Sequence, residues 1–183
     1  MGKTERTRDG LLRAALELFE ERGYGGTTVA AIAERAGVTE MTFFRHFPSK
    51  DAVLLSDPYD PLIADAILRM PSTSSPLTAA IGGIATAWRS VEPPVSADVR
   101  ERLRVVSQTP SLRAAIAKNS AATEAAIASA LVTRGTPATD ARIAASATMG
   151  ALNAALLEWA DGDDPDLGTA IAAAVRVLSG DRP

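Results

Sequence analysis

Cysteine is absent from the sequence, histidine occurs once, and aromatic side chains are scarce. Without cysteine the chain has no disulfide bond, no zinc–thiolate site and no cysteine nucleophile. Any histidine-based triad or metal site would have to be built around His46 alone. Aromatic residues make up 4% of the 183 residues, whereas alanine, the strongest helix former, occurs 36 times. This composition favours helices over a β-sandwich or barrel, and we expect an all-α protein with no cofactor and no metal.

A surplus of positive charge and a long hydrophobic run are also missing. The formal net charge is −3, but residues 1–50 carry eight basic and seven acidic side chains, and residues 51–183 carry eleven and fifteen. The acidic total therefore does not exclude nucleic-acid binding by the N-terminal part. The uncharged run over residues 143–157 contains polar side chains and is shorter than the roughly 20 apolar residues of a bilayer span. With no signal peptide in the polar, charged start, we predict a cytoplasmic protein without membrane contact.

Apolar residues recur with helical spacing near the N-terminus, which predicts three short helices and the start of a fourth. The first helix ends at Gly23 and is followed by a loop over residues 24–26. The second helix begins after a cap at Thr27 or Thr28 and ends at Gly37. The third is short and ends before a proline, and a serine caps the fourth.

Proline-rich segments divide the rest of the chain. Residues 57–61 contain two prolines and interrupt the fourth helix, because each proline removes a backbone donor. Beyond them the periodicity predicts helices over residues 61–70, 77–91, 96–108, 110–134, 138–160 and 166–179. We therefore predict two domains, residues 1–55 and residues 56–183.

The segment Ala36-Gly37-Val38 joins the second and third helices in a helix–turn–helix pattern, with glycine at the turn and Val38 packed between the helices. The sequences TVAAIAERAGVT (residues 28–39) and MTFFRHFPSK (residues 41–50) resemble the DNA-binding domain of the tetracycline-repressor (TetR) family, over about residues 7–55. The resemblance implies a helix–turn–helix DNA-binding domain followed by a helical ligand-binding and dimerisation bundle. It also implies a homodimer that binds a near-palindromic operator and releases it when a small ligand binds.

The predicted third helix, residues 40–47, carries residue types that read DNA bases. At 100° per residue, Phe43 and Phe47 share the inner face and Arg45 points almost opposite. Arg45 is therefore the candidate for bidentate hydrogen bonds to guanine O6 and N7, the alternative being a solvated surface arginine. Phe44 stands where the family usually has tyrosine, so it keeps only packing or a thymine-methyl contact. The full set of predicted DNA-contacting residues is Thr28, Thr39, Glu40, Met41, Thr42, Phe44, Arg45, His46 and Lys50.

Several members of this set also have a plain structural interpretation. Glu40 can accept a hydrogen bond from cytosine N4, or it can serve as an acid in the first turn of a helix. Thr28 and Thr39 are helix caps first, and their hydroxyls can also hold phosphates. The family resemblance implies phosphate contacts for His46 and Lys50.

In TetR-family proteins the last two helices usually form the dimer interface. Here the helix over residues 138–160 is rich in small residues, and the helix over 166–179 has an apolar stripe, so with their two-fold mates they would form a four-helix interface. The alternative is an intramolecular core. The predicted interface residues are Ile143, Ala147, Gly150, Leu157, Leu167, Ile171, Val175 and Leu178.

The helices over residues 61–134 are expected to enclose a ligand cavity. The predicted lining residues, each of which is otherwise an ordinary core residue, are Met70, Ile84, Trp88, Leu103, Val106 and Asn153. An arginine group beside an apolar tunnel would suit an anionic amphiphile. That group consists of Arg100, Arg102, Arg104 and Arg113.

These features predict a ligand-responsive transcriptional repressor. Residues 44–55 and 59–63 look like a subgroup that includes the mycofactocin regulator and is linked to acyl-CoA ligands, which implies an acyl-CoA or fatty-acid effector. The alternative is a helical binding or adaptor protein whose DNA reader has degenerated, for which Phe44 and Glu40 are the support. An enzyme is not expected, because the acid pair at residues 163–164 lies in a polar turn and the single histidine belongs to the DNA motif.

Overall fold

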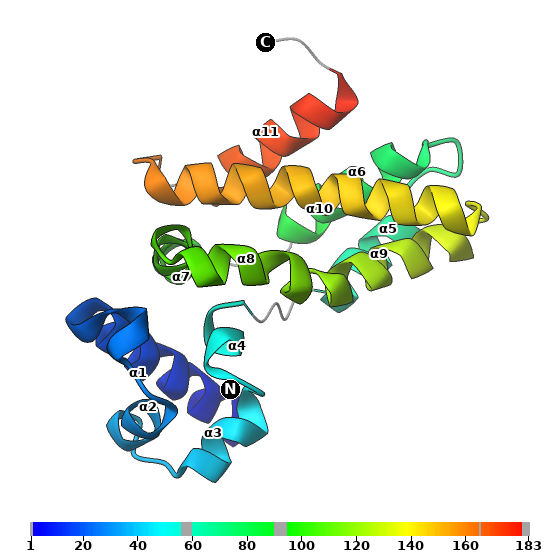
Figure 1. Cartoon of the computed structure of the whole chain (residues 1–183). Coiled ribbons are helices and arrows are strands. Elements are labelled where there is room, and N and C mark those ends of the chain that lie inside the picture. The colour runs from blue at the N-terminus through cyan, green and yellow to red at the C-terminus, as the bar shows by residue number, and fades with distance from the viewer. Residues whose placement is uncertain (1, 56–59, 90–94, 165, 181–183) are drawn as a thin grey trace.

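A computed structural model describes residues 2–55, 60–89, 95–164 and 166–180. Throughout this part of the chain the regular structure is helical and no strand is present, which confirms the predicted all-α class. The helices are α1 (Lys3–Gly26), α2 (Val29–Arg35), α3 (Glu40–His46), α4 (Lys50–Leu55), α5 (Asp60–Leu68), α6 (Pro76–Arg89), α7 (Val95–Gln108), α8 (Pro110–Asn119), α9 (Ala121–Thr133), α10 (Ala138–Asp161) and α11 (Leu167–Ser179). Figure 1 shows α1, α2 and α3 at one end of the molecule, α10 and α11 at the other, and α4 between them. None of the described helices is both long enough and apolar enough to cross a bilayer.

Local signals fix α2 and α3. Thr28 Oγ1 accepts a hydrogen bond from the Ala31 N–H (3.1 Å), and Thr39 Oγ1 accepts one from the Thr42 N–H (3.2 Å). Thr28 is therefore the cap of α2 and Thr39 the cap of α3, as predicted. Between the two helices Gly37 has a φ of 68°, a left-handed conformation that glycine adopts without strain. These caps and the glycine turn set the direction in which α3 leaves α2.

The structure differs from the sequence prediction directly after Gly23. Gly23 does break the first helix, with φ 72° and ψ 162°, but the loop predicted over Tyr24–Gly26 was wrong because these residues form a last helical turn of α1. The buried Thr27 holds this turn in place, since its Oγ1 donates toward the carbonyl oxygens of Leu18 (3.1 Å) and Gly23 (2.9 Å). The last turn of α1 and Thr27, which we call the α1–α2 corner, therefore fix where α2 begins.

The single helix predicted over residues 110–134 was also wrong. The segment forms α8 and α9, which meet at Ser120. The side chain of Ser120 is buried, and its Oγ accepts a hydrogen bond from Asn153 Nδ2 (3.1 Å) on α10. The other predicted helices of the C-terminal part are confirmed, with ends shifted by no more than two residues. Most of the predicted interruption over residues 57–61 lies outside the described residues, and α5 begins at Asp60.

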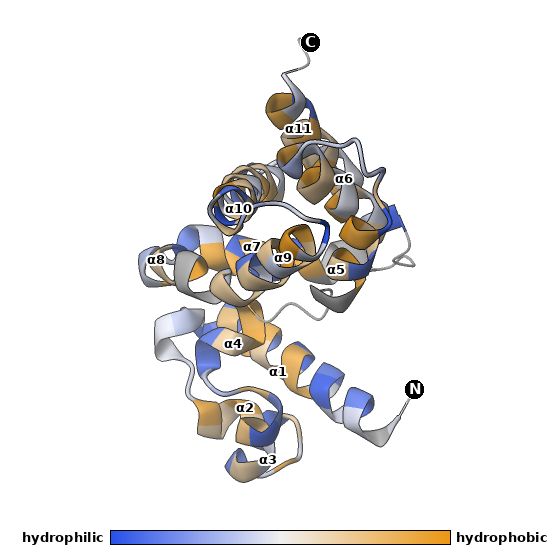
Figure 2. Cartoon of the chain, turned by 90° about the vertical axis from the view of Figure 1, so that its right-hand side faces the viewer, coloured by the Kyte–Doolittle hydropathy of each residue, from blue (hydrophilic) through white to orange (hydrophobic). Residues whose placement is uncertain are grey.

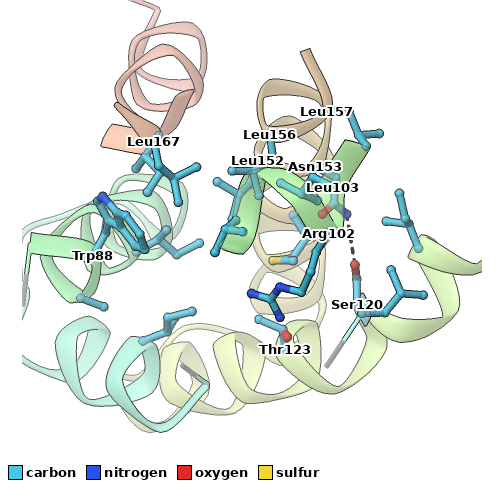
Figure 3. A pocket seen from close by; sticks show the side chains of 18 of the residues that line it. Trp88, Arg102, Leu103, Ser120, Thr123, Leu152, Asn153, Leu156, Leu157 and Leu167 are labelled. Atoms are coloured by element: carbon cyan, nitrogen blue, oxygen red, sulfur yellow. Dashed lines mark hydrogen bonds between the residues drawn. The ribbon is translucent and has the colours of Figure 1, made fainter. Parts of the chain in front are cut away.

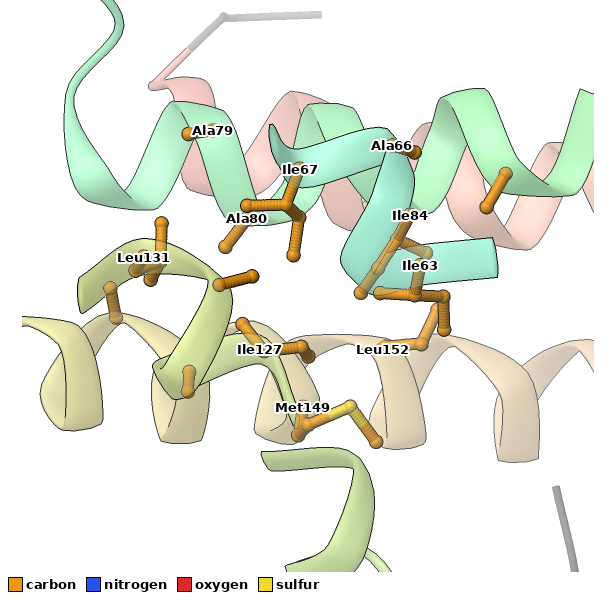
Figure 4. Close-up of a cluster of buried hydrophobic side chains, with 14 of the residues drawn as sticks. Ile63, Ala66, Ile67, Ala79, Ala80, Ile84, Ile127, Leu131, Met149 and Leu152 are labelled. Atoms are coloured by element: carbon orange, nitrogen blue, oxygen red, sulfur yellow. The ribbon is translucent and has the colours of Figure 1, made fainter. Parts of the chain in front are cut away.

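The main apolar core lies among α5, α6, α9, α10 and α11. Its members include Ile63, Ile67, Ile84, Ile127, Leu131 and Met149 (Figure 4). Helices α5 and α6 approach closely at Gly83, where an added Cβ would overlap Ile67 Cγ1 and lie 3.0 Å from the Ile67 backbone nitrogen. The guanidinium of Arg134 caps the C-terminal end of α5, donating to the carbonyl oxygens of Ile67 (3.1 Å), Met70 (2.6 Å) and Pro71 (2.7 Å).

A second apolar core joins the helix–turn–helix unit to the bundle. It contains Phe43 of α3, Phe47 at the end of that helix, Val53 of α4, Val106 of α7 and Leu112 of α8. Figure 2 shows apolar colouring on α4 where this helix lies between α1 and the helices α7 to α9. Helix α4 contacts α1 on one side and α7 and α8 on the other. It therefore joins the helix–turn–helix unit to the bundle.

Candidate nucleic-acid interface and ligand cavity

Helix α3 turns one face to the core and the other to solvent. Phe43 is fully buried, whereas Met41 and Phe44 expose 73% and 50% of their surface. Arg45 is exposed beside them, on the side that the helical geometry predicted. Figure 1 places α3 at a free end of the molecule. Its outer face is therefore an apolar and cationic surface that no other part of the described chain covers.

Most of the other predicted DNA-contacting residues lie close to this face. Thr28 and Glu40 are exposed, and Thr39 is exposed with its hydroxyl oxygen 3.1 Å from that of Thr42. Thr42 and His46 are half-buried. Eight of the nine residues thus belong to α3 or cap the start of α2 or α3.

Lys50, the ninth residue, is turned inward. Its Nζ donates to the carbonyl oxygens of Tyr24 (2.8 Å) and Thr27 (2.8 Å), and it lies 4.0 Å from the centre of the Tyr24 ring. The Tyr24 hydroxyl donates to the Asp51 carboxylate. Burial lowers the pKa of Lys50, while burial and then the bond to Asp51 raise the pKa of Tyr24. Lys50 therefore ties the start of α4 to the α1–α2 corner, a role that sequence reasoning missed because the partners are backbone carbonyls.

An exposed ion pair holds α2 against α1. Arg35 Nη1 lies 3.2 Å from Glu17 Oε2, and its two terminal nitrogens each lie 2.9 Å from a carboxylate oxygen of Glu21. The hydrogen bond from Arg35 lowers the pKa of the Glu21 carboxyl, and the bonds to Glu21 and Glu17 raise the pKa of the guanidinium. The sequence did not single out this pair, because its partners come from separate helices.

A cavity of about 170 Å³ lies inside the bundle, and Leu54 and Leu55 of α4 form part of its wall. Four of the six predicted lining residues do line it: Ile84, Trp88, Leu103 and Asn153. Met70 and Val106 do not appear among the described residues of the wall. Met70 lies against Gly82, and Val106 is buried in the core that α7 shares with α1 and α4.

Polar groups gather on one side of the cavity. Figure 3 shows the guanidinium of Arg102 pointing into the cavity toward Thr123. Close by, Asn153 Nδ2 donates to Ser120 Oγ. Trp88 lies on the opposite side, among aliphatic residues (Figure 3). The wall is therefore amphipathic, as the predicted arginine group beside an apolar tunnel implies, and Arg102 is its charged member.

Helix geometry separates the arginines of α7. Arg100 and Arg104 are four residues apart and share one face of the helix. Arg104 Nε donates to the carbonyl oxygen of Ala160 (2.9 Å), and the Arg100 guanidinium lies 4.1 Å from the centre of the Trp159 ring. Arg102 lies roughly 200° around the helix from Arg100 and faces the cavity. The predicted arginine group is thus divided: Arg102 lines the cavity, Arg100 and Arg104 lie at the C-terminal end of α10, and Arg113 is exposed on α8.

The predicted dimer interface also divides. Ile143 exposes 63% of its surface, and Ala147 and Gly150 follow it along the solvent side of α10. Leu167 and Ile171 are only 2% and 6% exposed and line the cavity, so they belong to the interior of this chain and not to a free face.

The remaining members of the predicted interface are half-buried. Leu157 lines the cavity and Val175 packs against the main core. Leu178 is half-buried near the end of α11. Val177, which was not predicted, exposes 68% of its surface. The apolar stripe that the sequence shows on α11 therefore faces mostly inward, and its neighbour Val177 faces solvent.

Two family models together match most of the chain. Residues 11–56 match the model for "Bacterial regulatory proteins, tetR family", and residues 75–183 match the "MftR C-terminal domain". With the exposed α3, these matches define a helix–turn–helix regulatory protein. The chain belongs to the TetR family. This confirms the resemblance found in the sequence, including the looser one to the mycofactocin-regulator subgroup.

Individual relatives agree with the family. The HTH-type transcriptional regulator TcmR of Streptomyces glaucescens is 37% identical over 139 residues, which cover 72% of this chain and 62% of TcmR. The chain thus spans less than two thirds of that relative. NalD of Pseudomonas aeruginosa, the secondary repressor of the MexAB-OprM multidrug efflux pump, has a TM-score of 0.58 at 23% identity, with 98% of each chain covered. FadR of Thermus thermophilus, a TetR-family repressor solved with lauroyl-CoA, has a TM-score of 0.50 at 21% identity, with 95% and 94% covered. At these identities the two structures show a shared fold.

Proposed function

We propose that the chain is a ligand-responsive transcriptional repressor that binds a near-palindromic operator as a homodimer in the cytoplasm. A small hydrophobic or amphipathic effector enters the cavity and releases the DNA. The observation that carries the proposal is α3, which is anchored by the buried Phe43 and exposes Met41, Phe44 and Arg45 on the other side. The similarity to the regulator TcmR and to the repressors NalD and FadR supports a repressor function.

In this proposal α3 enters the major groove, whose width admits one helix. Arg45 donates two hydrogen bonds to guanine O6 and N7. Met41 and Phe44 lie beside it, and their apolar surface suits the methyl group of thymine. Glu40, in the first turn, accepts from cytosine N4. A chain with phenylalanine in place of the usual tyrosine thus exchanges a phosphate contact for an apolar one.

The groups around α3 hold the DNA backbone. Thr28 and Thr39 place their hydroxyls at the starts of α2 and α3, where phosphate oxygens approach, and Thr42 and His46 follow on α3. Lys50 contributes by fixing α4 to the α1–α2 corner, and its charge adds to the attraction for phosphate.

Two copies of the chain pair through α10 and α11. Ile143, Ala147 and Gly150 form a small, partly apolar strip on the solvent side of α10, and Val177 extends the apolar surface onto α11. Small side chains let the helices of two protomers approach closely, as in a four-helix bundle. The two α3 helices are then held about one DNA turn apart, roughly 34–36 Å.

Helix α4 carries the signal between the proposed domains, residues 1–55 and 56–183. Leu54 and Leu55 line the cavity, while Val53 of the same helix is buried in the core shared with α3. A ligand that fills the cavity pushes on α4 and changes the spacing of the two recognition helices. Because FadR was solved with lauroyl-CoA, an acyl-CoA or a fatty acid belongs in any screen of effectors.

The proposal is tested by selecting an operator from random duplexes and measuring affinity by fluorescence anisotropy over a salt series. We expect tight binding to the selected duplex that weakens steeply as salt rises while the preference for that sequence persists. Arg45→Ala reduces the preference for the selected duplex at least about tenfold, and the charge-matched control Arg113→Ala, at an exposed site on α8, keeps it. Weak binding that is equal on all duplexes would overturn the repressor and favour the helical adaptor protein.

A further inference from the structure

We propose that the cavity binds a small organic anion, a monocyclic aromatic or short-chain aliphatic carboxylic acid, and that Arg102 receives its carboxylate. This inference rests on the proposed function, because it names the effector class of the same cavity. Three properties of the cavity carry it: the charge of one lining residue, the separation of polar from apolar groups, and the volume.

The charge comes from Arg102. It is the one ionisable side chain among the described residues that line the cavity, and Figure 3 shows its guanidinium inside the cavity. A guanidinium presents its donors as a rigid fork that fits the two oxygens of a carboxylate. In the low dielectric of an apolar cavity such a pair is worth more than in water. A ligand that brings a negative charge to this wall is therefore preferred over a neutral one of equal shape.

The polar groups near Arg102 extend the anion site. Thr123 is buried in the wall close to the guanidinium, and its hydroxyl can donate to a second lone pair of the carboxylate (Figure 3). The Asn153–Ser120 hydrogen bond lies on the same side. Trp88 and Leu167 lie away from these groups, across the cavity. A bound molecule is thus oriented, with its carboxylate at α7 and α9 and its apolar body toward α6 and α11.

The size of the cavity limits the apolar body. A cavity of about 170 Å³ is close to the roughly 150 Å³ that accommodates benzene in an engineered protein core. Pockets for drug-sized ligands enclose about 300–1,000 Å³. This volume therefore corresponds to one substituted ring or a short chain.

The position of the site explains how such a small ligand acts. Leu54 and Leu55 bring α4 to the wall, and Arg102 is on α7, which packs against both α1 and α4. Drawing the guanidinium toward a carboxylate therefore strains the contact between α7 and α4. The charge of the ligand acts on α7 and its volume acts on α4, and these two helices contact each other.

The test measures direct binding by isothermal titration calorimetry to the full chain. The probes are benzoate, phenylacetate and hexanoate, the neutral isostere phenylacetamide, and the long ligands dodecanoate and lauroyl-CoA. We expect the small carboxylates to bind, and phenylacetate to bind at least about tenfold more tightly than phenylacetamide. Arg102→Met brings that ratio close to one, Arg102→Lys reduces it, and the exposed control Arg113→Met leaves it unchanged. If Arg102→Met fails to fold, the inference is judged from the phenylacetate-to-phenylacetamide affinity ratio of wild type and from its change in Arg102→Lys.

The outcomes separate the inference from the proposed function. Each of three results would overturn the inference, whatever the DNA result. They are that no small carboxylate binds, that phenylacetate and phenylacetamide bind equally well, or that lauroyl-CoA binds more tightly than any small acid. Anisotropy with the selected operator is measured on the same preparations. If the chain binds the operator but none of the acids binds in the cavity, the repressor function stands and its effector is another molecule. If the chain binds the acids but selects no operator, the repressor function is overturned and the ligand site stands.

Discussion

At the scale of single residues, Lys50 and Arg45 are two cations of the helix–turn–helix unit in opposite environments. Lys50 makes charge-assisted hydrogen bonds to the carbonyls of Tyr24 and Thr27, whereas Arg45 is exposed on α3. Lys50→Met leaves both carbonyls without this donor and removes the contact with the Tyr24 ring. We expect the free energy of unfolding to fall by about 2 kcal/mol, measured by urea titration with circular dichroism.

Arg45→Ala is the matched control for this experiment. As an exposed residue it is expected to change the free energy of unfolding by no more than about 0.5 kcal/mol. The Arg45→Ala substitution weakens binding to the selected operator at least about tenfold, because it removes a bidentate contact to guanine. A Lys50→Met variant that is as stable as wild type would contradict the internal role of Lys50.

Glu21 provides a residue-scale prediction with a pH dependence. The hydrogen bond from Arg35 lowers the pKa of Glu21 in the folded chain, so its contribution to stability is complete above the ordinary glutamate pKa of about 4.5. That contribution is lost as the pH falls through the lower folded pKa. The difference in unfolding free energy between wild type and Glu21→Gln should therefore be present at neutral pH and vanish in acid.

The difference at Glu21 is small, because both partners are exposed, and it shrinks further in high salt. Glu20→Gln is the control, since Glu20 is an exposed acid next to Glu21 in the chain. We expect its unfolding free energy at neutral pH to lie within about 0.5 kcal/mol of that of wild type. A difference for Glu21→Gln that grows as the pH falls would show that the sign of the linkage is wrong.

At the scale of helices, the close approach of α5 and α6 at Gly83 gives the sharpest prediction. A methyl group at this position overlaps Ile67 Cγ1 and crowds the Ile67 backbone, which cannot move without displacing α5. Gly83→Ala is therefore expected to lower the free energy of unfolding by about 1–3 kcal/mol, despite the better helix propensity of alanine. Urea titration measures the change.

Gly10→Ala is the same substitution in a helix with space around it. No atom of the described residues lies within 4 Å of a Cβ added at Gly10, inside α1. Here alanine reduces the backbone entropy lost on folding, and we expect a gain of roughly 0.5–1 kcal/mol. Opposite signs for the two variants would establish that packing between α5 and α6, and not helix propensity, decides at Gly83. Equal signs would remove that explanation.

The helices show how far sequence reasoning reaches. Thr39 and Gly37 were predictable because a cap and a positive φ are properties of a few consecutive residues. The break at Ser120 was not, because no glycine or proline marks it and its partner Asn153 is 33 residues away. The outer face of α3 follows from helical period alone, so most of the candidate DNA-binding residues could be named from the sequence.

The cavity and the dimer surface depend on how helices pack, and there the sequence was a weaker guide. Leu167 and Ile171 share an apolar stripe with helical spacing, which fits an interface and an interior equally well. Only the packing of α11 on α10 and α6 decides that they face inward. Arg102 was one of several arginines until the direction of α7 set it apart from Arg100 and Arg104.

At the scale of the whole molecule, operator binding requires two copies of the chain. Ile143 is the most exposed large aliphatic residue of α10 and lies in the proposed strip with Ala147 and Gly150. Ile143→Arg places a charge at the centre of that strip, where desolvation is costly. We expect sedimentation velocity to show a shift from dimer to monomer.

The loss of the dimer has a second, separable consequence. Each monomer still folds and still presents α3, but it reaches only one half-site, so the operator affinity falls by on the order of a hundredfold or more through lost avidity. Leu68→Arg, which places the same charge on an exposed apolar residue of α5, is expected to remain dimeric and to bind normally. An Ile143→Arg protein that stays dimeric would show that the dimer interface does not include this strip of α10. One that becomes monomeric yet keeps full operator affinity would show that a single recognition helix suffices, and the near-palindromic operator would lose its basis.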